Sequence, residues 1–185
     1  MFLNHRGTQT IETERLILRR FELTDSQSVF ELWMNDPEVQ NNYGESVCNT
    51  VEEVERLLAK WLCLYNNNEF YRWSIILKEA NKSIGQIAFY LVNNQNQRAD
   101  VEYCIGQSCW GKGYAPEALK AVIDYAFRHI GINRVQAFHR SKNASSGNVL
   151  RKAGMKYEGT LKQYLLHKDE FDDCLMYGVT RDEWC

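Results

Sequence analysis

The segment CWGKGYAPE, residues 109–117, is the key to the fold because it joins two segments of different periodicity. Before it, Ala99–Gly106 alternates apolar and polar side chains, which is the period of a β-strand. After it, Tyr114–Ile130 repeats apolar side chains at helical spacing. Gly111 and Gly113 omit two side chains where the backbone turns from one element into the other. The segment is therefore predicted to be a tight strand-to-helix turn.

The start of the helix after this turn is a predicted anion site. Free N–H groups at a helix N-terminus carry the positive end of the helix dipole, and Lys112 adds a positive charge. A phosphate or pyrophosphate is the natural ligand. Two common phosphate motifs are excluded, since glycine follows Lys112 where a Walker loop needs Ser or Thr, and Pro116 replaces the last glycine of the dinucleotide fingerprint. A turn without a ligand remains the alternative for this segment alone.

Outward from the turn, the same periodicities predict the other elements. A capping box at Thr24 opens a first helix that Asp36-Pro37 ends, and Thr50 caps a second helix. After the helix Tyr114–Ile130, a fourth helix is predicted over Asn143–Ala153. The remaining predicted strands are Arg15–Phe21, Phe70–Lys78, Ile84–Val92, Arg134–Arg140, Tyr157–Leu166 and Cys174–Thr180. This order predicts an α/β fold, a mixed and mostly antiparallel central sheet with one β-α-β unit.

Composition limits the class of protein. The 185 residues fit one domain, 1–185. The chain has 22 basic and 24 acidic residues. Because this balance lacks the basic excess typical of nucleic-acid-binding proteins, we expect no nucleic-acid partner. The chain has no run of 18 apolar residues and no signal-like N-terminus, so we expect a cytoplasmic protein with no membrane partner. The six cysteines form no CxxC pair and the four histidines show no ligand spacing, which predicts free thiols and no metal.

A second motif follows the turn by about thirty residues. It runs from Asn143 and Ser146 through VLRKAGM, residues 149–155. Together with WGKGYA, residues 110–115, it resembles the GNAT superfamily of N-acetyltransferases, in particular the ribosomal-protein-alanine N-acetyltransferase branch. TERLILR near the N-terminus and Glu158–Gly178 match that branch too, so the resemblance covers about residues 11–184. It implies a GNAT fold with a splayed β-α-β unit and an acetyl-CoA-dependent N-acetyltransferase.

The resemblance also implies where acetyl-CoA binds as cosubstrate. The pyrophosphate is expected on the turn and helix start, and the pantetheine arm beside the preceding strand, where a backbone N–H near Tyr103 or Cys104 polarises the thioester carbonyl. Trp110 departs from the Gln or Arg of the family pattern. The expected cofactor-binding residues are Tyr103, Cys104, Ile105, Trp110, Gly111, Lys112, Gly113, Tyr114, Ala115, Asn143, Ser146 and Lys152.

Acetyl transfer to an amine requires a neutral nucleophile and a proton for the leaving thiolate. Glu102, in the middle of its strand, is the first candidate for the base, acting through a water. Ser146 is the candidate acid by resemblance, and Asn143 is expected to cap its helix and contact CoA. The branch often has a glutamate where this chain has Leu165, which leaves the base assignment open. Other acids, such as Glu158, Asp172 and Asp173, are expected to have structural roles.

The acceptor is expected to be a primary amine, either a protein N-terminal α-amine or a small molecule, acetylated directly in a ternary complex. Acidic residues around the site mildly favour a cationic acceptor. Most aromatic side chains are expected in the core. Four of them are also candidates to line the acceptor cleft, namely Trp33, Tyr43, Tyr71 and Tyr164. An acetyl-cysteine intermediate on Cys104 or Cys109 is disfavoured because no His/Asp partner is evident. The alternative function is a catalytically weak CoA-binding sensor or interaction module, and either function fits a monomer or a homodimer.

Overall fold

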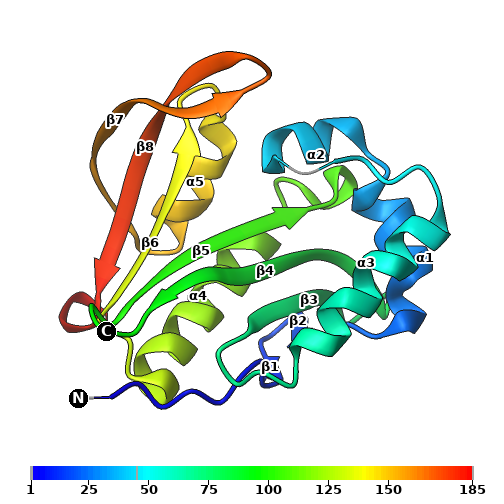
Figure 1. Cartoon of the computed structure of the whole chain (residues 1–185), viewed down its shortest axis with the longest axis horizontal. Helices are drawn as coiled ribbons and strands as arrows, with labels where there is room; N and C mark the ends of the chain where they lie inside the picture. The colour runs from blue at the N-terminus through cyan, green and yellow to red at the C-terminus, as the bar shows by residue number, and fades with distance from the viewer. Residues whose placement is uncertain (1, 45, 185) are drawn as a thin grey trace.

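A computed structural model describes residues 2–44 and 46–184 of the chain. Within these residues, eight strands form one sheet in the order β1-β2-β3-β4-β5-β6-β8-β7 (Figure 1). Every neighbouring pair is antiparallel except β5 and β6, so the predicted mixed, mostly antiparallel sheet is confirmed. The strands are β1 (Ile11–Glu12), β2 (Leu16–Arg19), β3 (Tyr71–Leu77), β4 (Lys82–Asn93), β5 (Arg98–Ile105), β6 (Arg134–Arg140), β7 (Lys156–His167) and β8 (Glu170–Thr180).

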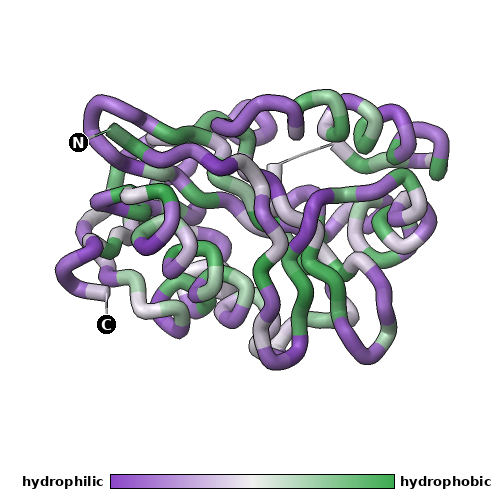
Figure 2. Tube along the Cα trace, turned by 90° about the horizontal axis from the view of Figure 1, so that it is seen from below, coloured by the Kyte–Doolittle hydropathy of each residue, from purple (hydrophilic) through white to green (hydrophobic). Residues whose placement is uncertain are grey.

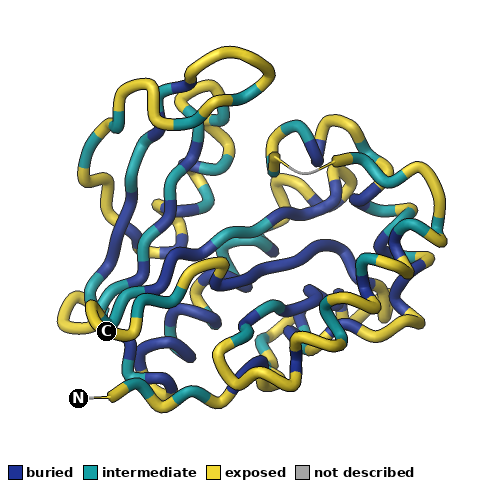
Figure 3. Tube along the Cα trace, in the orientation of Figure 1, coloured by how far each residue is buried: buried dark blue, intermediate teal, exposed yellow. Residues whose placement is uncertain are grey.

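Helices cover the sheet on two sides. They are α1 (Ser26–Val29), α2 (Pro37–Tyr43), α3 (Val51–Leu64), α4 (Tyr114–Tyr125) and α5 (Ala144–Lys152). One apolar cluster joins α4 and α5 to the strands, and Leu119, Val122 and Ile123 of α4 are fully buried in it. A second cluster joins α1 and α3 around Trp33 and reaches Cys104 of β5. Hydrophobic segments therefore follow the strands, while the loops are hydrophilic and exposed (Figures 2 and 3).

The parallel pair β5–β6 opens into a V (Figure 1). Its register contains only three pairs, which run from Arg98 opposite Arg134 to Asp100 opposite Gln136. Beyond that point β5 continues to Ile105 beside β4, while β6 continues to Arg140 beside β8. The facing edges of the two strands are therefore not paired with each other along the second half of β5. This opening is where the site lies.

One helix was missed in the sequence because of a proline. Asp36-Pro37 was predicted to end the first helix, but it begins a new one, α2. The Asp36 carboxylate accepts hydrogen bonds from the N–H groups of Glu38 (2.8 Å) and Val39 (3.4 Å), and Pro37 occupies the first turn. Proline is well tolerated there, since its missing N–H would have no partner in the helix.

The N-terminal caps give a mixed result. Thr50 caps α3 as predicted, accepting from the Glu53 N–H. The box predicted at Thr24 is wrong, because the reciprocal pair that opens this region is Glu22 with Asp25.

In the part of the chain that the structure describes, no helix combines the length and apolar character needed to cross a bilayer.

Candidate active site

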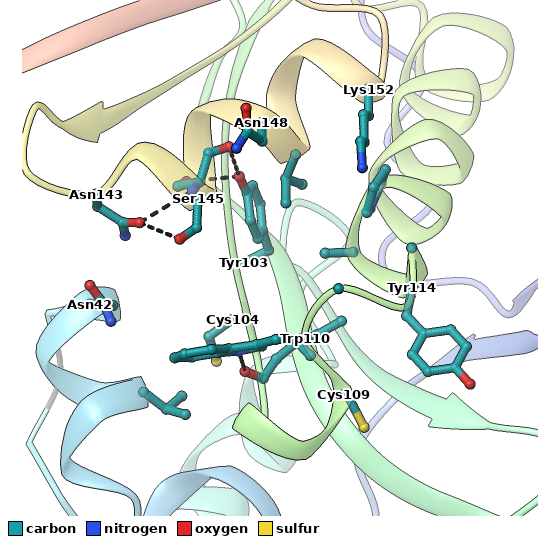
Figure 4. Close-up of a pocket in the computed structure, with 18 of the residues that line it drawn as sticks. Asn42, Tyr103, Cys104, Cys109, Trp110, Tyr114, Asn143, Ser145, Asn148 and Lys152 are labelled. Atoms are coloured by element: carbon teal, nitrogen blue, oxygen red, sulfur yellow. Dashed lines mark hydrogen bonds between the residues drawn. The ribbon is translucent and has the colours of Figure 1, made fainter.

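A cleft of about 300 Å³ lies in the opening between β5 and β6 (Figure 4). Its walls come from β5, the turn after it, the first turn of α4, one side of α5 and the end of α2. Eleven of the twelve predicted cofactor-binding residues line it: Tyr103, Cys104, Ile105, Trp110, Gly111, Gly113, Tyr114, Ala115, Asn143, Ser146 and Lys152. The twelfth, Lys112, is exposed and is not part of the lining.

The turn into α4 has the geometry of an anion site. Gly111 and Gly113 have φ values of 76° and 83°, in the left-handed region that glycine adopts without strain. Open space surrounds the position of a Cβ on Gly111. Among the described residues no side chain caps the helix, so the N–H groups of Tyr114 and Ala115 remain free for a ligand. A pyrophosphate fits this donor set by charge and by geometry.

Arg15 stabilises the turn into α4 through contacts with Lys112, Tyr114 and Glu117. Its Nη1 donates to the Lys112 carbonyl at 2.9 Å, and its Nη2 lies 2.6 Å from a carboxylate oxygen of Glu117 in α4. The guanidinium also stacks over the Tyr114 ring, 4.6 Å from its centre. Thr13 donates a further bond of 2.6 Å to Glu117. The N-terminal hairpin β1–β2 therefore holds the loop in place.

The ionisation of Glu117 follows from these contacts. Burial acts to raise the pKa of its carboxyl, but the hydrogen bonds from Thr13 and Arg15 outweigh burial and lower it below the ordinary value of 4.5. Glu117 is thus an anion next to an anion site. Arg15 balances its charge, so Glu117 does not repel a phosphate in the cleft.

Trp110, at the departure from the family pattern, has a different role from a phosphate ligand. Its indole Nε1 donates to the Ile105 carbonyl at 2.7 Å. The ring thus ties the turn to the end of β5 and lines the cleft. Because the indole N–H is used within the chain and the backbone N–H donates to the Gln107 carbonyl at 3.0 Å, Trp110 has no donor left for a phosphate.

Tyr103 of β5 and Ser146 of α5 form the wall where these two elements approach each other. The Tyr103 hydroxyl donates to the Ser146 carbonyl (3.0 Å) and lies 2.8 Å from the Ser146 hydroxyl. Burial raises the pKa of the Tyr103 phenol far above its ordinary value of 10.0. Tyr103 therefore stays protonated. Because its hydroxyl donates its proton to the Ser146 carbonyl, the Tyr103 oxygen accepts a hydrogen bond from the Ser146 hydroxyl.

Asn143 caps α5, as predicted. Its side-chain oxygen accepts from the Ser146 N–H (3.2 Å) and from the Ser145 hydroxyl (2.7 Å). The cap fixes the first turn of α5 and thereby the position of Ser146.

A second cavity of about 500 Å³ lies behind this wall. It shares Asn42, Tyr43, Tyr103, Asn143 and Ser146 with the first cleft. Among the described residues, Glu102 is the only carboxylate that lines either cavity.

Glu102 is held through one of its two oxygens. Its Oε1 accepts from the Tyr43 hydroxyl (2.6 Å) and from Nη2 of Arg72 (2.9 Å). Burial, followed by the charge of Glu102, raises the pKa of the Tyr43 phenol well above its ordinary value, so Tyr43 remains a donor. Arg72 is in turn held by Gln86 and by the Trp61 ring, 4.5 Å away. The other oxygen of Glu102 has no partner among the described residues and remains free to accept a proton.

The other acids considered from the sequence have basic partners. Glu158 pairs with Arg134. Asp172 pairs with Lys142 at 2.8 Å, and Asp173 pairs with Lys162 at 2.8 Å. None of the three acids lines either cavity.

The Cys104 thiol of the cleft is poorly suited to form a covalent intermediate. Burial raises the pKa of the Cys104 thiol to about 12, so it is almost entirely protonated at neutral pH. A protonated thiol is a poor nucleophile.

Leu165 lines the second cavity, so an apolar side chain occupies the place where the branch often has a glutamate.

Sequence relatives extend over most of the chain. The model of the acetyltransferase (GNAT) domain matches residues 15–156. An uncharacterized N-acetyltransferase p20 from Bacillus licheniformis is 32% identical over 176 residues, which is 95% of this chain and 98% of the relative. The ribosomal protein uS5-alanine N-acetyltransferase of Escherichia coli is 38% identical over 82 residues, 44% of this chain and 42% of that protein.

Solved structures agree in fold. A GNAT acetyltransferase from Bacillus anthracis superposes with a TM-score of 0.82 at 28% identity, covering 94% of this chain and 99% of the other. A ribosomal L7/L12 α-N-protein acetyltransferase in complex with CoA gives 0.82 at 21% identity, covering 95% and 99%. The domain match, the full-length relative and the splayed sheet place this chain in the GNAT family of N-acetyltransferases.

Proposed function

We propose that the protein transfers the acetyl group of acetyl-CoA directly to a primary amine in a ternary complex, as a single domain over residues 1–185. The observation that carries the proposal is the shared wall of the two cavities. One cavity has an uncapped helix start that suits a pyrophosphate, and the other contains Glu102. An acyl donor in the first and an amine in the second meet at Tyr103 and Ser146.

In this reaction the amine nitrogen attacks the thioester carbonyl carbon, a C–N bond forms and the C–S bond breaks. The nitrogen loses one proton to the free oxygen of Glu102, directly or through a water. The thiolate takes the hydroxyl proton of Ser146, which is reprotonated from solvent, while Tyr103 keeps its own proton and holds the Ser146 hydroxyl at 2.8 Å. Proton exchange with solvent also restores Glu102. A thiol pKa near ~8.5 makes the demand on Ser146 modest.

Acetyl-CoA suits the first cleft in charge as well as shape. The N–H groups at the start of α4 face the expected pyrophosphate, and Lys152 places a further positive charge on the lining. Support comes from the solved L7/L12 acetyltransferase of the same fold, which is in complex with CoA. Among the residues described, no cluster of metal-ligating side chains was found.

The proposal is tested first by ligand-dependent stability. A ligand at 100 times its dissociation constant adds about 2.7 kcal/mol to the free energy of unfolding, a shift of several degrees in Tm for a chain of this size. We expect this shift with acetyl-CoA and CoA but not with ATP. No shift at millimolar acetyl-CoA would refute the assignment of the first cleft.

The second test addresses the base. Glu102→Gln should reduce amine-dependent release of CoA by about 10²-fold or more, with little change in the acetyl-CoA shift. Glu170→Gln is the matched control, because Glu170 is 76% exposed and lies outside both cavities. Unchanged turnover in Glu102→Gln would remove Glu102 from the mechanism. Slow acetyl-CoA hydrolysis that no amine stimulates would favour a CoA-binding sensor instead.

A further inference from the structure

Besides Tyr103 of β5, aromatic side chains from four further elements line the second cavity. Tyr43 comes from α2, Tyr90 from β4, Phe138 from β6 and Tyr164 from β7. Phe138 and Tyr164 pack edge to face, with ring centres 5.3 Å apart. In strand order, Glu102 of β5 lies between Tyr90 and Phe138. The carboxylate and both aromatic rings line the same cavity.

Two irregularities of the sheet present the tyrosines. The register between β4 and β5 shifts between Phe89 and Leu91, which leaves Tyr90 as the extra residue of a bulge. The register between β7 and β8 shifts between Leu161 and Leu165, the segment that contains Tyr164. Bulges next to active sites commonly redirect a side chain.

The segment before Tyr164 is fixed in place. Gln163 has a φ of 49°, and its N–H donates to the Asp173 carboxylate at 2.8 Å. Tyr90 and Tyr164 are 47% and 52% exposed, and in the described structure no hydrogen bond engages either hydroxyl. Both rings are thus available to a ligand in the cavity.

The ionic groups of this cavity already have partners. Glu102 pairs with Arg72, and the Arg140 guanidinium donates to the Asn41 carbonyl (2.6 Å) and faces Asp172 (3.5 Å). Burial, and then the charge of Arg140, lowers the pKa of His167 below 6.5, so His167 is neutral at pH 7. A polyamine carries several cationic groups, and among the described residues the lining offers no carboxylate without a cationic partner to receive them.

On the basis of the proposed function, we propose that the acceptor is a small primary amine carrying an aromatic ring, such as an arylethylamine. Its nitrogen lies at the free oxygen of Glu102, and its ring lies against Tyr90, Phe138 and Tyr164. A volume of about 500 Å³ suits a molecule of this size. Aromatic rings prefer edge-to-face or offset contacts with one another, which a saturated ring of equal size does not reproduce.

The test compares amines that differ in one property. 2-Phenylethylamine and 2-cyclohexylethylamine share a chain length and an alkylammonium group, but only the first is aromatic. We expect a kcat/KM ratio of at least about tenfold in favour of the aromatic amine, equal to about 1.4 kcal/mol. Spermidine and a short peptide with N-terminal alanine should be poorer than both. Equal rates for the two ring amines, or a better rate for spermidine or the peptide, would overturn the proposal.

Variants of the two tyrosines test whether the preference for the aromatic amine arises in the second cavity. Tyr90→Leu and Tyr164→Leu should each reduce the ratio to about threefold or less and leave the KM for acetyl-CoA unchanged. Phe171→Leu is the matched control, since Phe171 is 63% exposed on β8 and lines neither cavity. A preference that survives in both tyrosine variants would also overturn the proposal. Failure of the acetyltransferase function looks different, because then no amine in the panel would stimulate CoA release.

Discussion

Replacing Arg15 separates the support of the turn from the chemistry of transfer. Arg15 lies outside both cavities, yet it connects the Lys112 carbonyl, the Glu117 carboxylate and the Tyr114 ring. Arg15→Leu removes all three contacts at once. It leaves the negative charge of Glu117 beside the expected pyrophosphate with only Thr13 as a side-chain partner. We therefore expect weaker acetyl-CoA binding rather than slower chemistry.

The size of the effect follows from the exposure of the pair. Hydrogen bonds to charged groups contribute about 1.5–3 kcal/mol when buried, and exposed ion pairs about 0.2–1 kcal/mol. The Arg15 side chain is 42% exposed and that of Glu117 17%, so the cost lies between these limits, at about 1–2 kcal/mol. If this free energy is lost from acetyl-CoA binding, the KM for acetyl-CoA increases by about tenfold. The kcat should change by less than about threefold, since no reacting group is touched.

The assay is steady-state CoA release at saturating amine, together with urea unfolding of the same samples. Arg15→Lys keeps a positive charge but not the planar fork, so its KM should lie between the wild type and Arg15→Leu. Arg128→Leu is the matched control, because Arg128 pairs with Asp124 near the far end of α4. A loss of stability with an unchanged KM in Arg15→Leu would refute the positioning role and leave a structural one.

Three further outcomes follow from the site. Ser146→Ala should lower kcat about tenfold or less with an unchanged KM for acetyl-CoA, which stopped-flow thiol detection measures; an unchanged kcat would mean that the thiolate takes its proton from water. Asn143→Ala should cost about 1 kcal/mol in urea unfolding through loss of the α5 cap, and an effect below ~0.3 kcal/mol would contradict a capping role for Asn143. The Glu117 contribution depends on pH: because the folded pKa lies below 4.5, its stabilisation is complete above that value and is lost as the pH falls through the folded pKa. The stability difference between the wild type and Glu117→Gln should accordingly shrink between pH 7 and pH 3, and a constant difference would exclude ionisation as its source.

The sequence predicts the features of this site that depend on local geometry. Two glycines before an amphipathic helix with an early proline indicate an uncapped helix start, and the structure has one at Tyr114. The limits Arg134–Arg140 of β6 and the cap at Asn143 were likewise correct, because each depends on residues adjacent in the chain.

Contacts between distant residues have no such signal. Arg15 and Glu117 are 102 positions apart, and Arg72 and Glu102 are 30 apart. Neither periodicity nor composition relates such pairs. The acidic residues therefore indicated a cationic acceptor from the sequence, whereas the structure gives Glu102 a basic partner in Arg72.

The acceptor cavity was predicted only in part for the same reason. Of the four aromatic residues considered for the cleft, Tyr43 and Tyr164 line the second cavity, while Trp33 and Tyr71 are buried in the core. Tyr90 was missed because only the pairing of β4 with β5 brings it to the cavity that contains Glu102, and this pairing has no signal in the local sequence.

The aromatic walls also bear on how a carboxylate acts as base toward an amine. An alkylamine resembles the lysine side chain, whose pKa is near ~10.4, so in water at neutral pH it is almost entirely protonated to ammonium. Burial in an apolar cavity disfavours the charged form and lowers that pKa. Glu102 on its own would oppose this by stabilising an ammonium, but Arg72 offsets its charge from 2.9 Å. In the proposed reaction the pairing of Glu102 with Arg72 and the rings around it therefore act in the same direction, toward a neutral amine positioned for attack on the thioester.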